Sequence, residues 1–293
     1  MTEAARVPRE HATWIRGARI AWREWGSAGD VPVIALHGWL DNAASFDALA
    51  PLLHGCRVIA PDLPGNGLSE HRGPEGSYNI WDDLPDLIAL VRELGLSRYR
   101  VMGHSRGAAI GTLLAAIEAD VVSSLVLLDG LAAPAFDPAE TVTQLRAFAH
   151  DYGERAPRAA RIFPGVDEAI EARCRASGTD RRAVTMLVGR SLEACEGGFR
   201  WRTDPRLRYA SAIKFSEPHI RAVFAAIGAP AMLLLAGDTR ARLSQMPGVT
   251  DWFPDLAIDE IPGSHHWHML DAAPAIAACI LDFWRNRDQS QDH

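Results

Sequence analysis

The chain has few of the residues that hold together small secreted or metal-binding proteins. Only four cysteines occur among its 293 residues, they lie far apart, and no two form a CxxC pair. Disulfide frameworks and thiolate metal sites require regular cysteine spacing, so this pattern indicates reduced thiols in an intracellular protein. The four are Cys56, Cys174, Cys195 and Cys279.

Long hydrophobic segments are absent as well. The most apolar region, Gly111–Leu128, is interrupted by Glu118 and Asp120, and it falls short of the roughly 20 apolar residues that span a bilayer. The N-terminal segment MTEAARVPREHATW is polar and lacks the apolar core of a secretory signal. We therefore expect a cytoplasmic protein without a membrane partner.

No block of basic residues stands out. The chain carries 30 basic and 37 acidic side chains, for a formal charge of −7, which argues against a nucleic-acid partner. Hydrophobic residues make up 48% of the chain, enough for a sizeable globular core. A small molecule is the expected partner, and the protein is expected to be a monomer or a homodimer.

Short apolar runs alternate with segments of helical periodicity. The runs favour buried parallel strands and the intervening segments favour helices, so we predict an α/β fold with a mostly parallel sheet and helices on both faces. An antiparallel hairpin that turns near Gly17 precedes them. The predicted strands are Val31–Gly38, Cys56–Gly65, Tyr99–Ser105, Ser123–Gly130, Pro230–Asp238 and Leu256–His266, and the predicted helices are Asn79–Leu94, Gly107–Ala119 and Pro274–Trp284.

This alternation stops in the middle of the chain. Residues 132–228 consist mostly of helical and loop-like sequence and fall between two predicted strands. We predict that they form a helical cap inserted between strands, and that residues 1–131 and 229–293 form the core. The polar tail after Trp284 is expected to fray.

The stretch VMGHSRGAAIG places Ser105 between Gly103 and Gly107. A strand-like segment enters this GxSxG motif and a helix of small residues leaves it, which is typical of the nucleophile elbow of a serine hydrolase. A serine hydroxyl needs a base and a residue that orients the base. On such a scaffold the histidine comes late in the chain, where GSHHWHML offers three histidines. No carboxylate or cysteine spacing accompanies them, so we predict no metal site.

Four motifs in order resemble the α/β-hydrolase superfamily, and within it the serine hydrolase-like branch. They are HGWLDNAASFDALAPLL, PDLPGNGLSEH, GHSRG and GSHHWH. The resemblance implies an α/β-hydrolase fold over most of residues 12–285. It implies His265 as the base, with His266 as the alternative. It also implies that the backbone amides of Trp39 and Arg106 form the oxyanion hole, and Trp39 is expected to contact the substrate.

Two aspartates are candidates for the triad acid. Relatives commonly carry this acid in a loop after the cap, where the present chain has AGDTRARL with Asp238 early and Arg240 at the usual position. Other relatives carry it after the preceding strand, which here ends in Asp129. We favour Asp129 and keep Asp238 as the alternative. Both follow predicted strands at their carboxyl ends, where catalytic groups of such sheets collect.

Arg106 is an unusual residue to follow a nucleophilic serine. A cation in the first turn of a helix opposes the helix dipole. We hypothesise that it pairs with an aspartate, such as Asp129 or Asp41, or that it favours substrates that bear a carboxylate. A side chain extended into solvent is the alternative.

Together these features predict an enzyme that hydrolyses a small carboxylic ester through an acyl-enzyme on Ser105, without a cofactor. A lactonase or a carbon–carbon bond hydrolase with the same triad is an alternative activity. A ligand-binding protein without turnover is the alternative from another class, since a fold alone does not determine function. Trp81 is among the aromatic residues that either line a substrate pocket or pack in the core.

Overall fold

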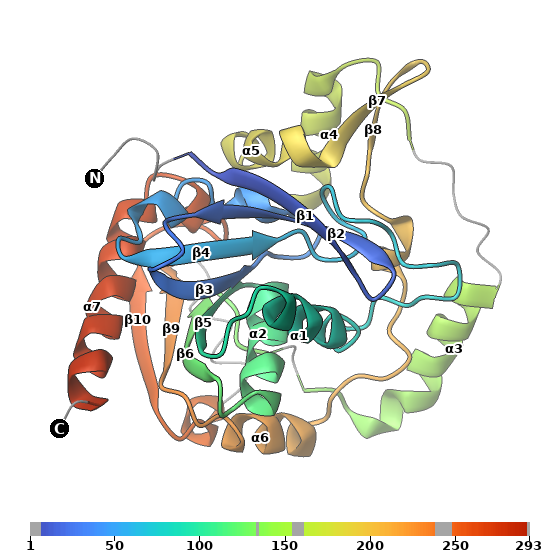
Figure 1. The fold of residues 1–293 in the computed structure, drawn as a ribbon. Coiled ribbons are helices and arrows are strands. Elements are labelled where there is room, and N and C mark those ends of the chain that lie inside the picture. Colours follow the sequence, from blue (N-terminus) through green and yellow to red (C-terminus); the bar gives the residue numbers. More distant parts are fainter. Residues whose placement is uncertain (1–6, 133–134, 154–160, 238–247, 292–293) are drawn as a thin grey trace.

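The computed structural model describes residues 7–132, 135–153, 161–237 and 248–291 (Figure 1). The strands are β1 Arg9–Ile15, β2 Ala18–Trp25, β3 Val31–Leu36, β4 Cys56–Pro61, β5 Tyr99–His104, β6 Val122–Leu128, β7 Leu192–Cys195, β8 Gly198–Trp201, β9 Ala231–Ala236 and β10 Leu256–Ile261. The α-helices are α1 Leu84–Glu93, α2 Arg106–Ile117, α3 Thr141–Gly153, α4 Val166–Ser177, α5 Arg181–Ser191, α6 Glu217–Ala225 and α7 Ala273–Gln291.

The main sheet contains eight strands in the order β1-β2-β4-β3-β5-β6-β9-β10. The strands from β4 to β10 in this order run parallel, whereas β1 and β2 form the predicted antiparallel hairpin at one edge. Arg16 and Gly17 both have positive φ angles at its turn, 50° and 85°, as a tight hairpin turn requires. The predicted α/β architecture with a mostly parallel sheet is therefore confirmed.

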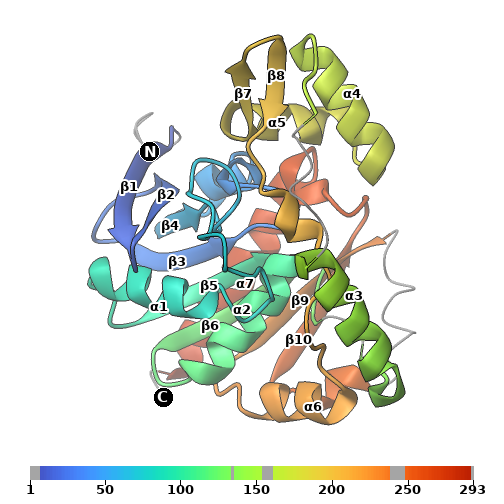
Figure 2. The ribbon, with the colours of Figure 1, turned by 90° about the vertical axis from the view of Figure 1, so that its right-hand side faces the viewer.

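Helices cover both faces of the sheet (Figures 1 and 2). Alternate residues of the central strands point to opposite faces: Ile34 of β3 joins the apolar cluster under α1, α2 and α6, and Val33 joins the cluster under α7. Burial on both faces is the reason that the strands read as continuous apolar runs. Among the described residues, no helix is both long and apolar enough to cross a bilayer.

Two helix boundaries differ from the prediction. The helix expected from Asn79 begins only at Leu84, because the Asp82 carboxylate accepts a hydrogen bond from the Asn79 amide and holds the preceding residues in a turn. The C-terminal segment does not fray at Trp284, since α7 continues to Gln291. The buried Arg100 guanidinium donates two hydrogen bonds, of 2.8 and 2.7 Å, to Asp288 and anchors this last part of α7.

The segment between β6 and β9 contains α3, α4, α5, α6 and the hairpin formed by β7 and β8 (Figure 2). This small hairpin was not predicted. Helix α6 lies within the predicted cap, yet its Ile220 and Phe224 pack in the core cluster beside α2. The division into a core and a cap of residues 132–228 stays a prediction.

Buried ion pairs join α4 and α5 to the body of the protein. Arg190 of α5 and Asp62 of the loop after β4 are both almost wholly buried, and their closest N–O distance is 2.7 Å. Arg173 of α4 donates a hydrogen bond of 2.7 Å to the buried Asp41, close after β3. A buried charge without a partner is costly, so these pairs hold the two helices over the carboxyl ends of the strands.

Candidate active site

Ser105 stands at the sharp turn between β5 and α2. Its φ and ψ angles are 53° and −115°, a strained conformation for a residue with a side chain. The turn is so tight that a Cβ atom at Gly103 would lie 2.3 Å from the Gly107 carbonyl oxygen, and one at Gly107 would lie 2.1 Å from the Leu36 carbonyl oxygen. Only glycine fits at both positions, and the serine hydroxyl is left at the carboxyl edge of the sheet.

His265 joins this serine to an aspartate. Its Nε2 lies 2.9 Å from Ser105 Oγ, and its Nδ1 is hydrogen-bonded to Asp129 Oδ2. Because a carboxylate only accepts hydrogen bonds, Nδ1 carries the proton and Nε2 presents a lone pair to the serine hydroxyl. This orientation allows His265 to accept the hydroxyl proton.

Asp129 is held in place from two sides. It follows β6 directly with a φ of 49°, and its side chain is almost wholly buried. Its second oxygen, Oδ1, accepts a hydrogen bond of 3.0 Å from the backbone amide of Ala236 at the end of β9. The carboxylate therefore has a fixed direction toward His265.

The turn after β3 lies against the start of α2. A Cβ atom at Gly107 would lie 2.1 Å from the Leu36 carbonyl oxygen and 2.6 Å from that of His37, so the segment that contains Trp39 adjoins the helix that Arg106 begins. Arg106 is the first residue of α2, where backbone amides have no intrahelical partner. His37 shapes this turn. Leu63 donates its amide to His37 Nε2, and Nδ1 donates to the Gly38 carbonyl.

Comparison with known proteins agrees with this geometry. A family model described as the alpha/beta hydrolase fold matches residues 31–272, more than half of the chain. The chain belongs to the α/β-hydrolase family.

Relatives and solved structures extend this assignment. The chain is 29% identical to the serine hydrolase-like protein of Danio rerio over 91% of this chain and 85% of that protein. It is 32% identical to a hypothetical protein of Pseudomonas aeruginosa PAO1 of known structure, with a TM-score of 0.90 over 94% of this chain and 99% of the other. A thioesterase domain from the curacin biosynthetic pathway has a TM-score of 0.81 at 25% identity, over 94% and 99% of the two chains.

The other candidates from the sequence are His266, Asp238 and Trp39. His266 turns toward Asp41, with 3.6 Å between Nε2 and Oδ2. Asp238 lies outside the described residues. Trp39 is half exposed, and its indole nitrogen donates a hydrogen bond of 3.0 Å to the Leu207 carbonyl oxygen. This bond ties the turn after β3 to the segment that follows β8.

Arg106 pairs with an aspartate, but not with either of the two that were predicted. Its guanidinium lies 2.9 Å from Oδ2 of Asp83, a buried residue directly before α1, and Arg72 lies 3.1 Å from the same carboxylate. Asp83 therefore offsets the cation in the first turn of α2.

Sequence reasoning missed a second layer of residues behind His265. His104 is wholly buried, and its Nε2 donates a hydrogen bond of 2.9 Å to the His265 carbonyl oxygen. Its ring lies 4.2 Å, centroid to centroid, from that of the equally buried His268. Burial, and then the adjacent ring of His268, lower the pKa of His104 well below its ordinary value. The sequence signal for His104 was its position directly before Ser105 in GHSRG.

Asp41 lies next to this layer. Burial alone raises the pKa of Asp41, but the nearby imidazole of His266 and the charge of Arg173 outweigh burial and hold that pKa below its usual range. Nothing in the sequence of α4 pointed to Arg173 as its partner. Within the described parts of the chain, no three side chains of His, Cys, Asp or Glu are placed to hold a metal ion.

Proposed function

We propose that the protein is a serine hydrolase that cleaves small carboxylic esters through an acyl-enzyme on Ser105. The observation that carries this proposal is the placement of His265, whose two ring nitrogens face Ser105 Oγ and Asp129 Oδ2. A nucleophile, a base and an orienting carboxylate in this relationship are the parts that acyl transfer requires.

In the proposed reaction, His265 Nε2 takes the proton of Ser105 as Oγ attacks the ester carbonyl carbon. The backbone amides of Trp39 and Arg106 bind the resulting oxyanion, a contribution of about 3 kcal/mol for each donor. The tetrahedral intermediate collapses, the bond from the carbonyl carbon to the alcohol oxygen breaks, and the imidazolium of His265 protonates the departing alcohol. Asp129 stabilises that imidazolium and keeps the ring oriented.

The second half of the cycle repeats these steps with water. His265 removes a proton from a water molecule, the hydroxide attacks the acyl-enzyme carbonyl, and Ser105 leaves with the proton returned by His265. The products are the carboxylic acid and the regenerated serine. Trp39 lies in the turn after β3 and is half exposed, and we propose that it contacts the substrate.

The test measures hydrolysis of p-nitrophenyl acetate and butyrate together with labelling by a fluorophosphonate probe. Ser105→Ala is expected to abolish labelling and to lower kcat by about 10⁴-fold or more. His265→Ala should behave similarly, and His266→Ala should retain most of the activity.

Asp129→Asn and Asp238→Asn form a matched pair for the acid. Asp129→Asn is expected to lower kcat about 10³- to 10⁴-fold, because the amide favours the wrong tautomer of His265. Asp238→Asn should stay within a few-fold of the wild type. A wild-type protein that neither turns over esters nor accepts the probe would refute the proposal and favour a ligand-binding role.

A further inference from the structure

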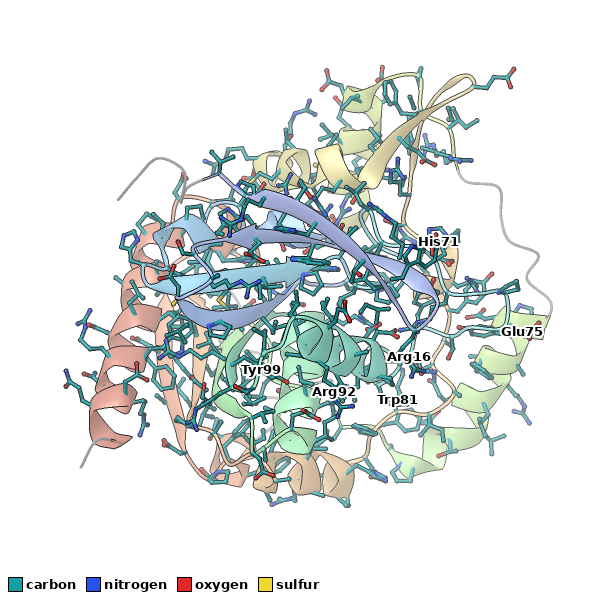
Figure 3. The ribbon with its side chains drawn as sticks, in the orientation of Figure 1. Arg16, His71, Glu75, Trp81, Arg92 and Tyr99 are labelled. Atoms are coloured by element: carbon teal, nitrogen blue, oxygen red, sulfur yellow. The ribbon has the colours of Figure 1, made fainter. Side chains whose placement is uncertain are left out.

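A cavity of about 160 Å³ lies between α2 and α6. Ala109 and Leu113 line it from α2, and Val223 lines it from α6. Trp81, which is labelled in Figure 3, forms another part of the wall and stacks on Phe215 with 5.5 Å between ring centroids. Trp81 was one of the aromatic residues whose role, pocket or core, the sequence left open.

This cavity begins beside the nucleophile without including it. The amide of Ala109 donates to the Ser105 carbonyl oxygen at 3.3 Å, so this lining residue stands one helical turn, roughly 6 Å, along α2 from Ser105. Ala132, another lining residue, follows Asp129 by three positions. Neither Ser105 nor His265 lines the cavity.

The wall of the cavity is suited to an apolar group. Most of the side chains that line it are aliphatic or aromatic, and the hydroxyl of Thr112 is already engaged, at 2.9 Å from the Ala108 carbonyl oxygen. An apolar cavity of about 150 Å³ is large enough to accept a benzene molecule. The present cavity is of this size, and it can take a ring or a short alkyl chain.

One charged side chain stands at the edge of this cavity. Lys214 lies on the exposed segment before α6 and is the only lysine in the chain. Across the described residues its ammonium group makes no ion pair, and it lies 5.7 Å from the centroid of the Phe136 ring. No acidic residue lines the cavity, so Lys214 is the charged side chain of its lining.

We propose that the cavity between α2 and α6 holds the apolar part of the substrate's acyl group, and that Lys214 pairs with an anionic group at the far end of that same acyl chain. The preferred substrates are then half-esters of aliphatic dicarboxylic acids. This inference rests on the proposed ester hydrolysis at Ser105.

The first experiment compares p-nitrophenyl esters from acetate to octanoate. With each methylene that enters the cavity, kcat/KM should rise by up to about fourfold, and the increase should stop once the cavity is full. Val223→Phe places a ring in the cavity from α6 and should abolish the increase. Ala222→Phe, at the exposed neighbouring position of α6, is the matched control and should retain the wild-type profile.

The second experiment compares p-nitrophenyl half-esters of dicarboxylic acids, from succinate to suberate, with neutral esters of the same length. At the length that reaches Lys214, the half-ester should be preferred. Lys214→Met should then lower its kcat/KM about three- to tenfold and leave the neutral ester unchanged, and Lys214→Arg should restore the preference. An increase in ionic strength should weaken the preference in the wild type.

Binding to the Ser105→Ala variant gives a readout that does not depend on turnover. Adipate monomethyl ester should bind more tightly to this variant than to the variant that also carries Lys214→Met, as measured by calorimetry. If the wild type hydrolyses acetate and accepts the fluorophosphonate, but shows neither a chain-length increase nor a preference for half-esters, this inference is wrong and the proposed function stands. If the probe does not label Ser105, the proposed function itself fails.

Discussion

The imidazole of His104 supports the loop of His265 through one hydrogen bond, 2.9 Å from Nε2 to the His265 carbonyl oxygen. Since a carbonyl only accepts, Nε2 of His104 carries the proton. The bond joins the residue before the nucleophile to the backbone of the proposed base. It holds the backbone of His265 in position relative to Ser105. We therefore regard His104 as a positioning residue in the proposed reaction.

His104→Phe is therefore expected to lower kcat about five- to tenfold with little change in KM, because roughly 1 kcal/mol of positioning is lost while the buried ring is kept. His104→Gln retains an N–H donor and should recover most of the loss. Steady-state kinetics with p-nitrophenyl butyrate measure both variants, and unfolding in urea shows whether either has lost stability. Equal losses in the two variants would contradict a role for the hydrogen bond.

Arg106→Met tests whether Arg106 serves to balance the charge of Asp83 or to recognise an anionic group of the substrate. The guanidinium lies 2.9 Å from the buried Asp83, so its removal leaves that carboxylate to Arg72 alone. We expect the free energy of unfolding to fall by about 1–3 kcal/mol, and the preference among anionic and neutral esters to stay unchanged. Asp83→Asn in the same chain should recover part of the stability. A lost preference for half-esters would place the anion at Arg106 instead of Lys214.

The sequence predicted the parts of the site that are local along the chain. GHSRG contains both the tight turn and the small residues that it demands, and each central strand is a short apolar run. The choice between Asp129 and Asp238 as the triad acid could not be made from local sequence, because it depends on where two loops lie in space. The structure brings Asp129 to His265. Ala236 at the end of β9, two residues before Asp238, donates its backbone amide to the same Asp129 carboxylate.

Pairings between distant segments explain the wrong predictions. Arg106 begins α2 and Asp83 directly precedes α1, and neither residue carries a local signal for the other. The polar composition of the tail after Trp284 predicted fraying. The tail is ordered because Asp288 pairs with Arg100 of β5, a residue far away in sequence. The hairpin of β7 and β8 did have a local signal, two consecutive glycines with positive φ, Gly197 and Gly198, but its strands are only four residues each.

Arg190→Met is expected to be among the most destabilising changes in α5. Arg190 and Asp62 are both almost wholly buried, and removal of one member of such a pair leaves a buried charge unpaired, at a cost of about 3–5 kcal/mol. The free energy of unfolding is measured in urea. Arg181→Met, at the exposed start of the same helix, breaks an ion pair with Asp167 of α4 and should cost less than about 1 kcal/mol. Addition of Asp62→Asn to Arg190→Met should recover stability, and a further loss would contradict the pairing.

Stability is expected to fall as the pH drops below about 6.5, because buried histidines must take up protons on unfolding. Burial is the main cause that lowers the pKa of His268 and of His104 well below the ordinary value of 6.5. It also lowers the pKa of His37. The folded state therefore keeps these rings neutral at a pH where the unfolded chain binds protons, and stability rises with pH through this range. Each such histidine contributes a slope of up to about 1.4 kcal/mol per pH unit.

His268→Phe tests this dependence at a position where the ring has no hydrogen bond to lose, since both nitrogens are unpartnered among the described residues. The free energy of unfolding, measured in urea between pH 5.0 and 7.5, should depend less steeply on pH in the variant by up to about 1.4 kcal/mol per unit. Asp41 does not interfere. Its lowered pKa affects stability only below the ordinary aspartate value of 3.8, since above that value both folded and unfolded states are ionised. Equal slopes in the two proteins would show that His268 takes up its proton in the folded state, and would exclude it as a source of acid instability.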